Sequence, residues 1–388
     1  MTINKEQGQA GLYVHIPFCL KKCGYCGFLS FGGCSEETQR QYVQALVREL
    51  EFHKGENAAI DTIYIGGGTP SLLPADCVEA ILDAARENFK VTEDPEISLE
   101  VNPKTLTESK LKIYHRAGVN RLSLGAQSMD DGLLVFMGRA HDQADFQESW
   151  RMVREQGFSN VNVDLMFGVP GQSQDLWEDS LKQVLELRPE HVSFYSLQLE
   201  EGTPFYRQYK AGEMDLPSTE EDRRMYHQGI HMLKKAGYDH YEISNCARPG
   251  FASRHNSKYW NFEEYFAVGL GAHSFRYDQG RQRNVSHLET YIQRIRQGLL
   301  PVDERAFQQE SLRDHMGEYV FTALRKSEGL DTADFEKVFG TSFFSVYKEQ
   351  MTAVSTYQEQ GLLYVNGGRI ALTEKGIDCS NEIMAEFV

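Results

Sequence analysis

The sequence predicts an α/β protein built on a parallel sheet or barrel, followed by a smaller helical domain. Short apolar runs alternate with amphipathic helical stretches through most of the chain, which is the order that parallel β/α architectures require. The apolar runs are continuous, as expected for strands that are buried on both faces. With 388 residues the chain exceeds one ordinary core, so we expect one domain over residues 1–300 and another over residues 301–388.

Seven apolar runs are the predicted strands, and three helices between them are the clearest. The segment 36–54 places its apolar residues on one helical face, and Ser35 is suited to cap its first turn. The helical segments 78–88 and 176–187 follow later strands in the same way. The predicted strands are residues 12–18, 62–65, 97–101, 121–124, 161–166, 192–199 and 241–243.

Polar residues gather where the first five predicted strands end. In a parallel barrel these ends open on one face, and active sites form there. One such cluster is a weak signal, but five in succession predict a single pocket. The clusters are the cysteine loop that begins at Cys19, Gly66-Gly-Gly-Thr-Pro70, Glu100-Val-Asn-Pro103, Gly125-Ala-Gln-Ser128 and Asp164-Leu-Met-Phe-Gly-Val-Pro170.

The cysteine loop has the spacing C-x3-C-x2-C, formed by Cys19, Cys23 and Cys26. Three thiolates at this spacing can ligate three irons of a cubane cluster, whereas an ordinary 4Fe–4S cluster takes four cysteines. The fourth iron would then be open, and a metal with an open position can bind a substrate.

Zinc ligation and disulfide formation are the two alternative roles of these cysteines. A structural zinc site normally uses two C-x2-C pairs, so here Cys34 would have to be the fourth ligand of a single pair. A disulfide framework is disfavoured because the seven cysteines are sparse and odd in number. The polar first ten residues lack the apolar core of a signal peptide, and we therefore expect a reducing, cytoplasmic location.

The charge of the chain limits its partners. A net charge of −16 opposes binding to nucleic acid or to anionic lipid, although a peripheral contact with a membrane protein stays compatible with it. No apolar run approaches the roughly 20 residues of a transmembrane segment.

Residues 311–388 read as helices followed by a short hairpin over 362–373, with Asn366-Gly367 as its turn. This order is winged-helix-like. Residues 301–388 hold 8 Lys and Arg against 15 Asp and Glu, a net of 8 − 15 = −7, whereas a DNA-binding wing would be basic. We therefore expect a lid or a partner-contact module.

A second group of polar and aromatic residues is Arg254-His-Asn-Ser-Lys-Tyr-Trp260. A neutral imidazole beside an aromatic wall suits axial ligation of heme iron, which makes His255 a candidate ligand. The alternative is a histidine that only hydrogen-bonds its neighbours.

Taken together, these motifs resemble the HemN/HemW branch of radical S-adenosylmethionine proteins, and the likeness spans nearly the whole chain. It implies a partial (β/α)6 TIM-type barrel with a smaller C-terminal winged-helix-like domain. It also implies a 4Fe–4S cluster held by Cys19, Cys23 and Cys26, whose open iron chelates S-adenosylmethionine for reductive cleavage. The residues that carry the resemblance are Cys19-x3-Cys23-Gly-Tyr-Cys26-Gly-Phe28, Gly66-Gly-Gly-Thr-Pro-Ser71, Gly125-Ala-Gln-Ser128, Asp164-Leu-Met-Phe-Gly168 and His255-Asn-x-x-Tyr-Trp260.

The resemblance assigns a shell of residues to S-adenosylmethionine and His255 to heme. From the residues alone, Glu100 could instead be a buried turn-capping carboxylate and Arg139 a surface ion pair. Whether a second S-adenosylmethionine binds stays open. The implied shell consists of Tyr13, Tyr25, Gly67, Gly68, Thr69, Glu100, Gln127, Arg139 and Asp164.

Within this branch the sequence favours the HemW-type heme chaperones. Coproporphyrinogen dehydrogenases carry a fourth cysteine where this chain has Phe28, and they have a longer N-terminal segment. The resemblance thus implies a carrier that delivers heme to an apo-hemoprotein, such as a respiratory one, and that draws electrons from a donor protein. The alternatives are an oxygen-independent coproporphyrinogen III oxidase and an anaerobic heme-opening or heme-methylating enzyme.

Overall fold

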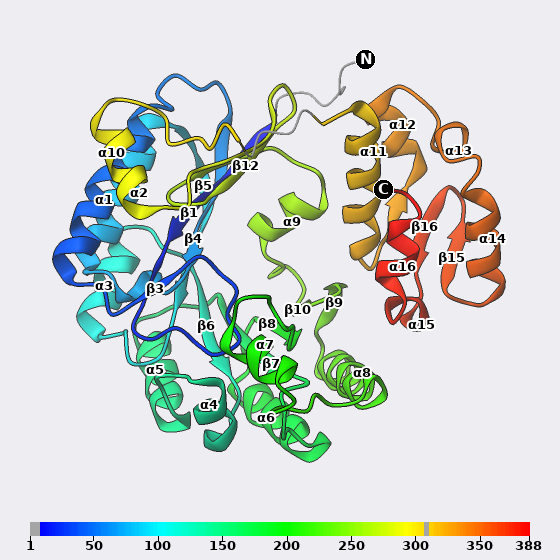
Figure 1. Cartoon of the computed structure of the whole chain (residues 1–388), viewed down its shortest axis with the longest axis horizontal. Coiled ribbons are helices and arrows are strands. Elements are labelled where there is room, and N and C mark those ends of the chain that lie inside the picture. Colours follow the sequence, from blue (N-terminus) through cyan, green and yellow to red (C-terminus); the bar gives the residue numbers. More distant parts are fainter. Residues whose placement is uncertain (1–7, 306–309) are drawn as a thin grey trace.

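The structure is a computed structural model that describes residues 8–305 and 310–388 (Figure 1). Its centre is an eleven-stranded sheet in the order β13-β12-β11-β1-β4-β5-β6-β7-β8-β10-β9. Six strands run parallel in chain order within this open sheet, so the sheet forms a partial barrel as expected. The six are β1 (Gln9–Ile16), β4 (Ala59–Gly67), β5 (Lys90–Val101), β6 (Arg121–Gln127), β7 (Val161–Phe167) and β8 (His191–Ser196).

Three features of the sheet differ from the prediction. The predicted strand 192–199 ends at Ser196, because the chain turns away toward a helix. The predicted strand 241–243 lies in β9 (Asp239–Glu242), which pairs antiparallel with β10 (Asn245–Ala247) and is not a further β/α unit. The prediction missed β11 (Tyr265–Val268), which adds parallel to the free edge of β1.

Two short pairings complete the barrel. The strands β12 (His273–Arg276) and β13 (Gly280–Arg283) form an antiparallel hairpin beyond β11. The strands β2 (Phe18–Cys19) and β3 (Phe31–Gly32) pair with each other and close the cysteine loop at its base.

Helices lie along the outer side of the sheet, where they cover its apolar face (Figure 1). The helix α1 shows why they form where they do. The Ser35 hydroxyl accepts a hydrogen bond from the N–H of Thr38, and Tyr42, Leu46 and Leu50 are fully buried on one face. The helices are α1 (Glu36–Glu51), η1 (Pro70–Leu72), α2 (Ala75–Asn88), α3 (Glu108–Arg116), α4 (Asp131–Met137), α5 (Gln143–Glu155), α6 (Gln174–Leu187), α7 (Pro204–Lys210), α8 (Thr219–Lys235), α9 (Arg254–Trp260) and α10 (Leu288–Arg296).

The C-terminal part contains the predicted helices and hairpin. A third strand, β14, pairs with β16, so the hairpin belongs to a three-stranded sheet. Two short helices that the sequence did not predict follow the hairpin. The elements are α11 (Leu312–Arg325), β14 (Leu330–Asp331), α12 (Thr332–Phe339), α13 (Phe343–Val346), α14 (Met351–Glu359), β15 (Leu363–Asn366), β16 (Arg369–Leu372), α15 (Glu374–Ile377) and α16 (Ser380–Ala385).

A second hydrophobic core belongs mainly to this C-terminal part. It also includes Phe262, Tyr265 and Phe275, which precede residue 300 in the chain. Ion pairs join the two parts as well, including Lys234 with Glu374 at 2.6 Å. The division at residue 300 stays a prediction.

Candidate cofactor site

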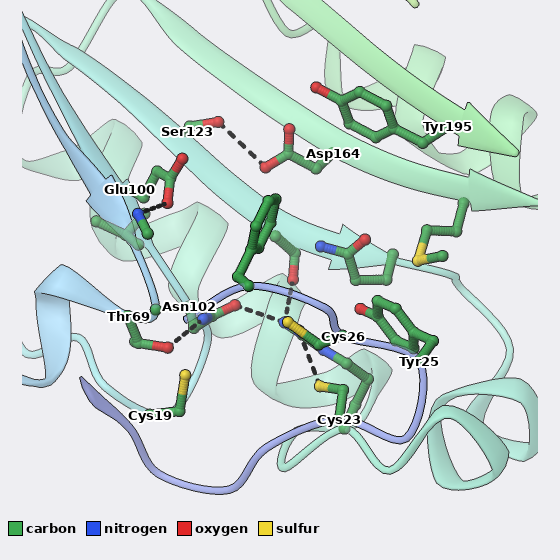
Figure 2. Close-up of a pocket in the computed structure, with 18 of the residues that line it drawn as sticks. Cys19, Cys23, Tyr25, Cys26, Thr69, Glu100, Asn102, Ser123, Asp164 and Tyr195 are labelled. Atoms are coloured by element: carbon green, nitrogen blue, oxygen red, sulfur yellow. Dashed lines mark hydrogen bonds between the residues drawn. The ribbon is translucent and has the colours of Figure 1, made fainter. Parts of the chain in front are cut away.

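A pocket of about 540 Å³ opens where the parallel strands end. Eleven of the thirteen predicted site residues line it, so the five strand-end clusters do meet in one place. In Figure 2 the cysteines lie on one side of this pocket, and Glu100, Ser123 and Asp164 lie opposite them. The eleven are Cys19, Cys23, Tyr25, Cys26, Gly67, Gly68, Thr69, Glu100, Gln127, Arg139 and Asp164.

The three cysteines are free thiols at the edge of the pocket. Burial raises the pKa values of the Cys19 and Cys26 thiols, and a bound metal would offset this by favouring the thiolates. Among the described residues, these three are not a group whose ligand atoms all lie within 4.8 Å of one another. A single tetrahedral zinc would hold sulfurs about 3.8 Å apart, whereas a cubane separates its thiolates more widely.

Two helices support the cysteine loop from outside. The N–H of Gly24 donates to the carbonyl of Met137 over 3.1 Å, and the Gly24 carbonyl accepts from the N–H of Phe205 over 3.0 Å. The Phe205 ring also lies 6.2 Å from the Tyr25 ring, centroid to centroid. The loop is thus fixed by α4 and α7, which lie far from it in sequence.

The glycine segment Gly66-Gly-Gly-Thr-Pro70 lies against the rest of the barrel through its backbone N–H groups. Those N–H groups are used within the protein. The N–H of Gly67 donates to Glu100 Oε2 over 3.0 Å, the N–H of Gly68 to the Ile16 carbonyl, and that of Thr69 to the Phe18 carbonyl. Glycine is needed here for space, because a Cβ on Gly68 would lie 2.7 Å from the Phe18 carbonyl oxygen.

Two half-buried carboxyl groups, of Glu100 and Asp164, face the cysteines across the pocket. Burial, with a contribution from Asp164, raises the pKa of Glu100 to about 7, and burial also raises the pKa of Asp164. Tyr64 donates to Glu100 over 2.9 Å, while Ser123 and Asn162 donate to Asp164 over 3.1 and 2.8 Å. Both carboxyl groups line the pocket, and an ionised carboxylate is a hydrogen-bond acceptor.

Arg139 does not form the surface ion pair that was its alternative role. Its guanidinium donates to Cys23 Sγ over 3.6 Å, to the Asn102 side-chain oxygen and to the Gly125 carbonyl. Gly125 leaves room for this group, because a Cβ there would lie 2.8 Å from Asn102 Oδ1. Gln127 completes the wall with a φ of 66°, a backbone conformation that costs a non-glycine residue about 1 kcal/mol or more.

Several residues that line the pocket were not singled out from the sequence. Asn102 was the most predictable, since it lies in a strand-end cluster, and its amide donates to Thr69 Oγ1 over 2.8 Å. The others project from inside the strands. Tyr64, Ser123 and Asn162 each lie two residues before a strand-end cluster, which is a local signal, whereas Ser193 and Tyr195 have no such neighbour. The others include Tyr64, Arg121, Ser123, Asn162, Ser193 and Tyr195.

Two predicted residues lie outside the lining of this pocket. The Tyr13 ring stacks on Tyr64 at 6.3 Å, behind the pocket wall. His255, in α9, is 1% exposed, and its Nδ1 and Nε2 each lie 2.8 Å from a hydroxyl oxygen, of Thr62 and Tyr259 respectively. Burial, with the nearby charge of Lys258, lowers the pKa of His255 to about 3. Both ring nitrogens are therefore engaged, and the imidazole is neutral.

The fold and the pocket define a radical S-adenosylmethionine protein. Residues 13–184 match the family described as the radical SAM superfamily, and residues 311–378 match the HemN C-terminal domain. Among solved structures, coproporphyrinogen III oxidase (HemN) from Escherichia coli, described as a radical SAM enzyme, superposes with a TM-score of 0.85 at 25% identity, over 98% of this chain and 91% of that one.

Curated relatives narrow the class. The chain is 35% identical to the heme chaperone HemW of Lactococcus lactis over 97% of this chain and 96% of the relative, and 35% identical to that of Bacillus subtilis over 97% and 98%. The chain belongs to the HemW family of the radical SAM superfamily. Such membership implies a 4Fe–4S cluster and S-adenosylmethionine, for which the pocket has free thiols and half-buried carboxyl groups. No helix in the described part of the chain is long and apolar enough to cross a bilayer.

Proposed function

We propose that this protein binds heme and transfers it to apo-hemoproteins. The observation that carries the proposal is the likeness to HemW heme chaperones over nearly the full length of both chains. Phe28 supports it, because it occupies the position where coproporphyrinogen dehydrogenases have a fourth cysteine. Oxygen-independent coproporphyrinogen III oxidase activity and heme opening or methylation are the competing functions that an experiment must exclude.

The cofactors belong to the same proposal. Cys19, Cys23 and Cys26 would ligate a 4Fe–4S cluster, which supplies an electron to S-adenosylmethionine when both are bound. The chain's own part is to hold the cofactor. Glu100 and Asp164 accept from its hydroxyl and ammonium groups, and Arg139 holds one edge of the pocket against Cys23. Tyr13, Tyr25, Gly67, Gly68, Thr69 and Gln127 complete the proposed shell.

His255 is the proposed axial ligand of heme. In the present arrangement its nitrogens lie against the Thr62 and Tyr259 hydroxyls, so ligation requires one of these two hydrogen bonds to break. Loss of a buried hydrogen bond costs about 1–3 kcal/mol, which a metal–imidazole bond can supply. The proposal also includes an electron donor protein and a cytoplasmic location.

The test offers heme and coproporphyrinogen III side by side to anaerobically reconstituted protein. We expect about one heme per chain with a shifted Soret band, transfer of that heme to an apo-hemoprotein, and unchanged coproporphyrinogen III in the presence of S-adenosylmethionine and reductant. Formation of protoporphyrinogen would establish the oxidase, and chemically altered heme would establish the third alternative. His255→Ala should change the heme spectrum, and an identical spectrum would remove His255 as a ligand.

A further inference from the structure

Three side chains of the kind that bind metal ions meet at the start of the C-terminal part. Glu310 precedes Ser311, which caps α11, and His315 and Glu318 lie three residues apart on that helix, so they share one of its faces. One carboxylate oxygen of each glutamate and one ring nitrogen of His315 lie within 4.8 Å of one another. This group does not belong to the lining of the cofactor pocket.

Two atoms of this group have no hydrogen-bond partner within the described ranges 8–305 and 310–388. His315 is 8% exposed, and its Nδ1 and the Oε2 of Glu310 are both buried and unpartnered. The two atoms lie 3.5 Å apart, yet they form no hydrogen bond with each other. Buried polar atoms are normally satisfied, so both atoms are available to a ligand that lies between them.

The distance between these two atoms favours a metal ion over a water molecule. A water that bonded both at the usual length would hold them about 4.5 Å apart. A tetrahedral Zn²⁺ with ligands at about 2.1 Å holds them about 3.4 Å apart. The observed 3.5 Å therefore matches two ligands of one metal ion.

Aromatic rings fix the orientation of the His315 imidazole. The rings of Phe262 and Phe275 each lie 6.0 Å from it, centroid to centroid. Apolar rings offer no acceptor to the imidazole, so the carboxyl group of Glu310 is the polar group that its Nδ1 faces.

The two carboxyl groups already have one cation beside them. Arg281, from β13, contacts Glu318, and its Nε lies 3.9 Å from Glu310 Oε1. One guanidinium thus offsets two carboxylates, and it leaves Glu310 Oε2 and His315 Nδ1 unbonded. Arg281 also donates to the Tyr265 hydroxyl over 2.7 Å, a bond that would keep it in place if Glu318 turned to a metal.

We propose that Glu310, His315 and Glu318 bind one divalent transition-metal ion, for which Zn²⁺ is the probe. One imidazole with two carboxylates suits Zn²⁺ and its neighbours in the series, whereas Mg²⁺ and Ca²⁺ take oxygen ligands. Three protein ligands leave a fourth position for water. Glu318 exchanges its ion pair with Arg281 for the metal, so Arg281 competes with the ion. The site is independent of the proposed heme function.

The experiment measures Zn²⁺ binding to the full chain by equilibrium dialysis and metal analysis. The cysteine loop is first loaded with iron and sulfide, because free thiolates would also bind zinc, and a second series uses chain with alkylated thiols. The parent is compared with His315→Gln, Glu318→Gln and Arg281→Gln. Exposed residues of the same types supply the matched controls, which are His231→Gln on α8, Glu336→Gln on α12 and Arg151→Gln on α5.

The parent and the three controls should bind about one Zn²⁺ per chain. His315→Gln and Glu318→Gln should bind it at least about tenfold more weakly, because loss even of a group behind a ligand costs that much. Arg281→Gln should bind it more tightly than the parent, since the competing cation is gone. Zn²⁺ should also raise the melting temperature of the parent but not that of His315→Gln.

A parent that binds no Zn²⁺ would overturn the proposal. Equal binding by the parent, His315→Gln and Glu318→Gln would also overturn it, because the zinc would then lie elsewhere on the surface. If His315→Gln does not fold, Glu318→Gln decides the outcome. An Arg281→Gln variant that binds no better than the parent would contradict the exchange at Glu318.

Discussion

Arg139 and Cys23 lie 116 residues apart in the sequence, and a guanidinium nitrogen of Arg139 lies 3.6 Å from the Sγ of Cys23. The contact places a positive charge and a donor against one of the three sulfurs that the proposed cluster would use. Hydrogen bonds and charges at the sulfurs help to set the reduction potential of a cluster. The position of Arg139 should therefore affect the reduction potential of the proposed cluster.

Arg139→Gln should lower the reduction potential of the reconstituted cluster. The variant loses a positive charge that favours the more negative, reduced state. A loss of about 1 kcal/mol corresponds to a shift of about 40 mV for one electron. Potentiometric titration followed by EPR measures it. An unchanged potential, within the scatter of the Arg151→Gln control, would show that the contact does not reach the cluster.

The three cysteines should be sufficient for the cluster. Anaerobic reconstitution of the parent should give about four iron and four sulfide per chain. Cys23→Ala should abolish the iron chromophore, and Cys34→Ala should leave it intact. Iron and sulfide analysis with absorption spectra measures this, and tight binding of zinc without iron, dependent on Cys34, would contradict it.

Glu100 should make cofactor binding and stability respond to pH in opposite directions. Its folded pKa of about 7 lies above the usual value, so the folded state binds more protons than the unfolded state between about pH 4.5 and 7. The stability of the chain without cofactor should therefore fall as pH rises through this window, by at most about 3 kcal/mol from this group. Binding of S-adenosylmethionine should instead strengthen as Glu100 ionises.

Glu100→Gln tests both effects at once. Urea unfolding at pH 5 and pH 8 should show a smaller loss of stability for the variant than for the parent, and calorimetry should show weaker S-adenosylmethionine binding at pH 8. If the variant loses more stability at pH 8 than at pH 5, relative to the parent, the carboxyl group is ionised and well stabilised in the folded state.

Because His255 is neutral in the folded state, it should make the free energy of unfolding fall as the solution becomes more acidic. Its folded pKa of about 3 lies below the unfolded value, so only the unfolded state gains a proton as pH falls below about 6.5. Between pH 7.5 and 5.5 this group alone should cost the folded state about 1.4 kcal/mol. His255→Gln should remove that dependence, whereas His231→Gln on the exposed side of α8 should not. Urea unfolding of apo protein measures the difference, and an identical pH dependence for parent and variant would contradict it.

Gly67→Ala should destabilise the protein more than Gly171→Ala does, because only at Gly67 would the added Cβ also clash with a neighbouring side chain. Gly67 has a φ of +113°, and a Cβ there would lie 2.5 Å from the His15 ring. Gly171 also has a positive φ of +81°, but a Cβ there would meet nothing within 4 Å. Gly171→Ala should therefore cost about 1 kcal/mol, and Gly67→Ala clearly more, with loss of cluster incorporation. Equal melting temperatures for the two variants would contradict the steric argument.

The sequence by itself determined the fold class and predicted the chemistry of this protein. The spacing of Cys19, Cys23 and Cys26 lies within one short loop, so local order is enough to specify a ligand set. The β/α alternation specified the parallel sheet, and the polar strand ends had to share one face because parallel strands point the same way. The cysteine spacing depends only on neighbours along the chain, and the shared face of the strand ends depends only on strand direction. Both can be read from a single sequence.

Only the tertiary structure decided which partner each polar group has. His255 Nδ1 lies 2.8 Å from the hydroxyl of Thr62, 193 residues away in the chain, and Glu100 accepts the N–H of Gly67. The Nε of Arg121 is buried without a hydrogen-bond partner among the described residues. A shift of a few tenths of an ångström decides whether a hydrogen bond forms. Side-chain positions are set to that precision by strand register and by packing between distant segments, and the spacing of residues along the chain does not specify them.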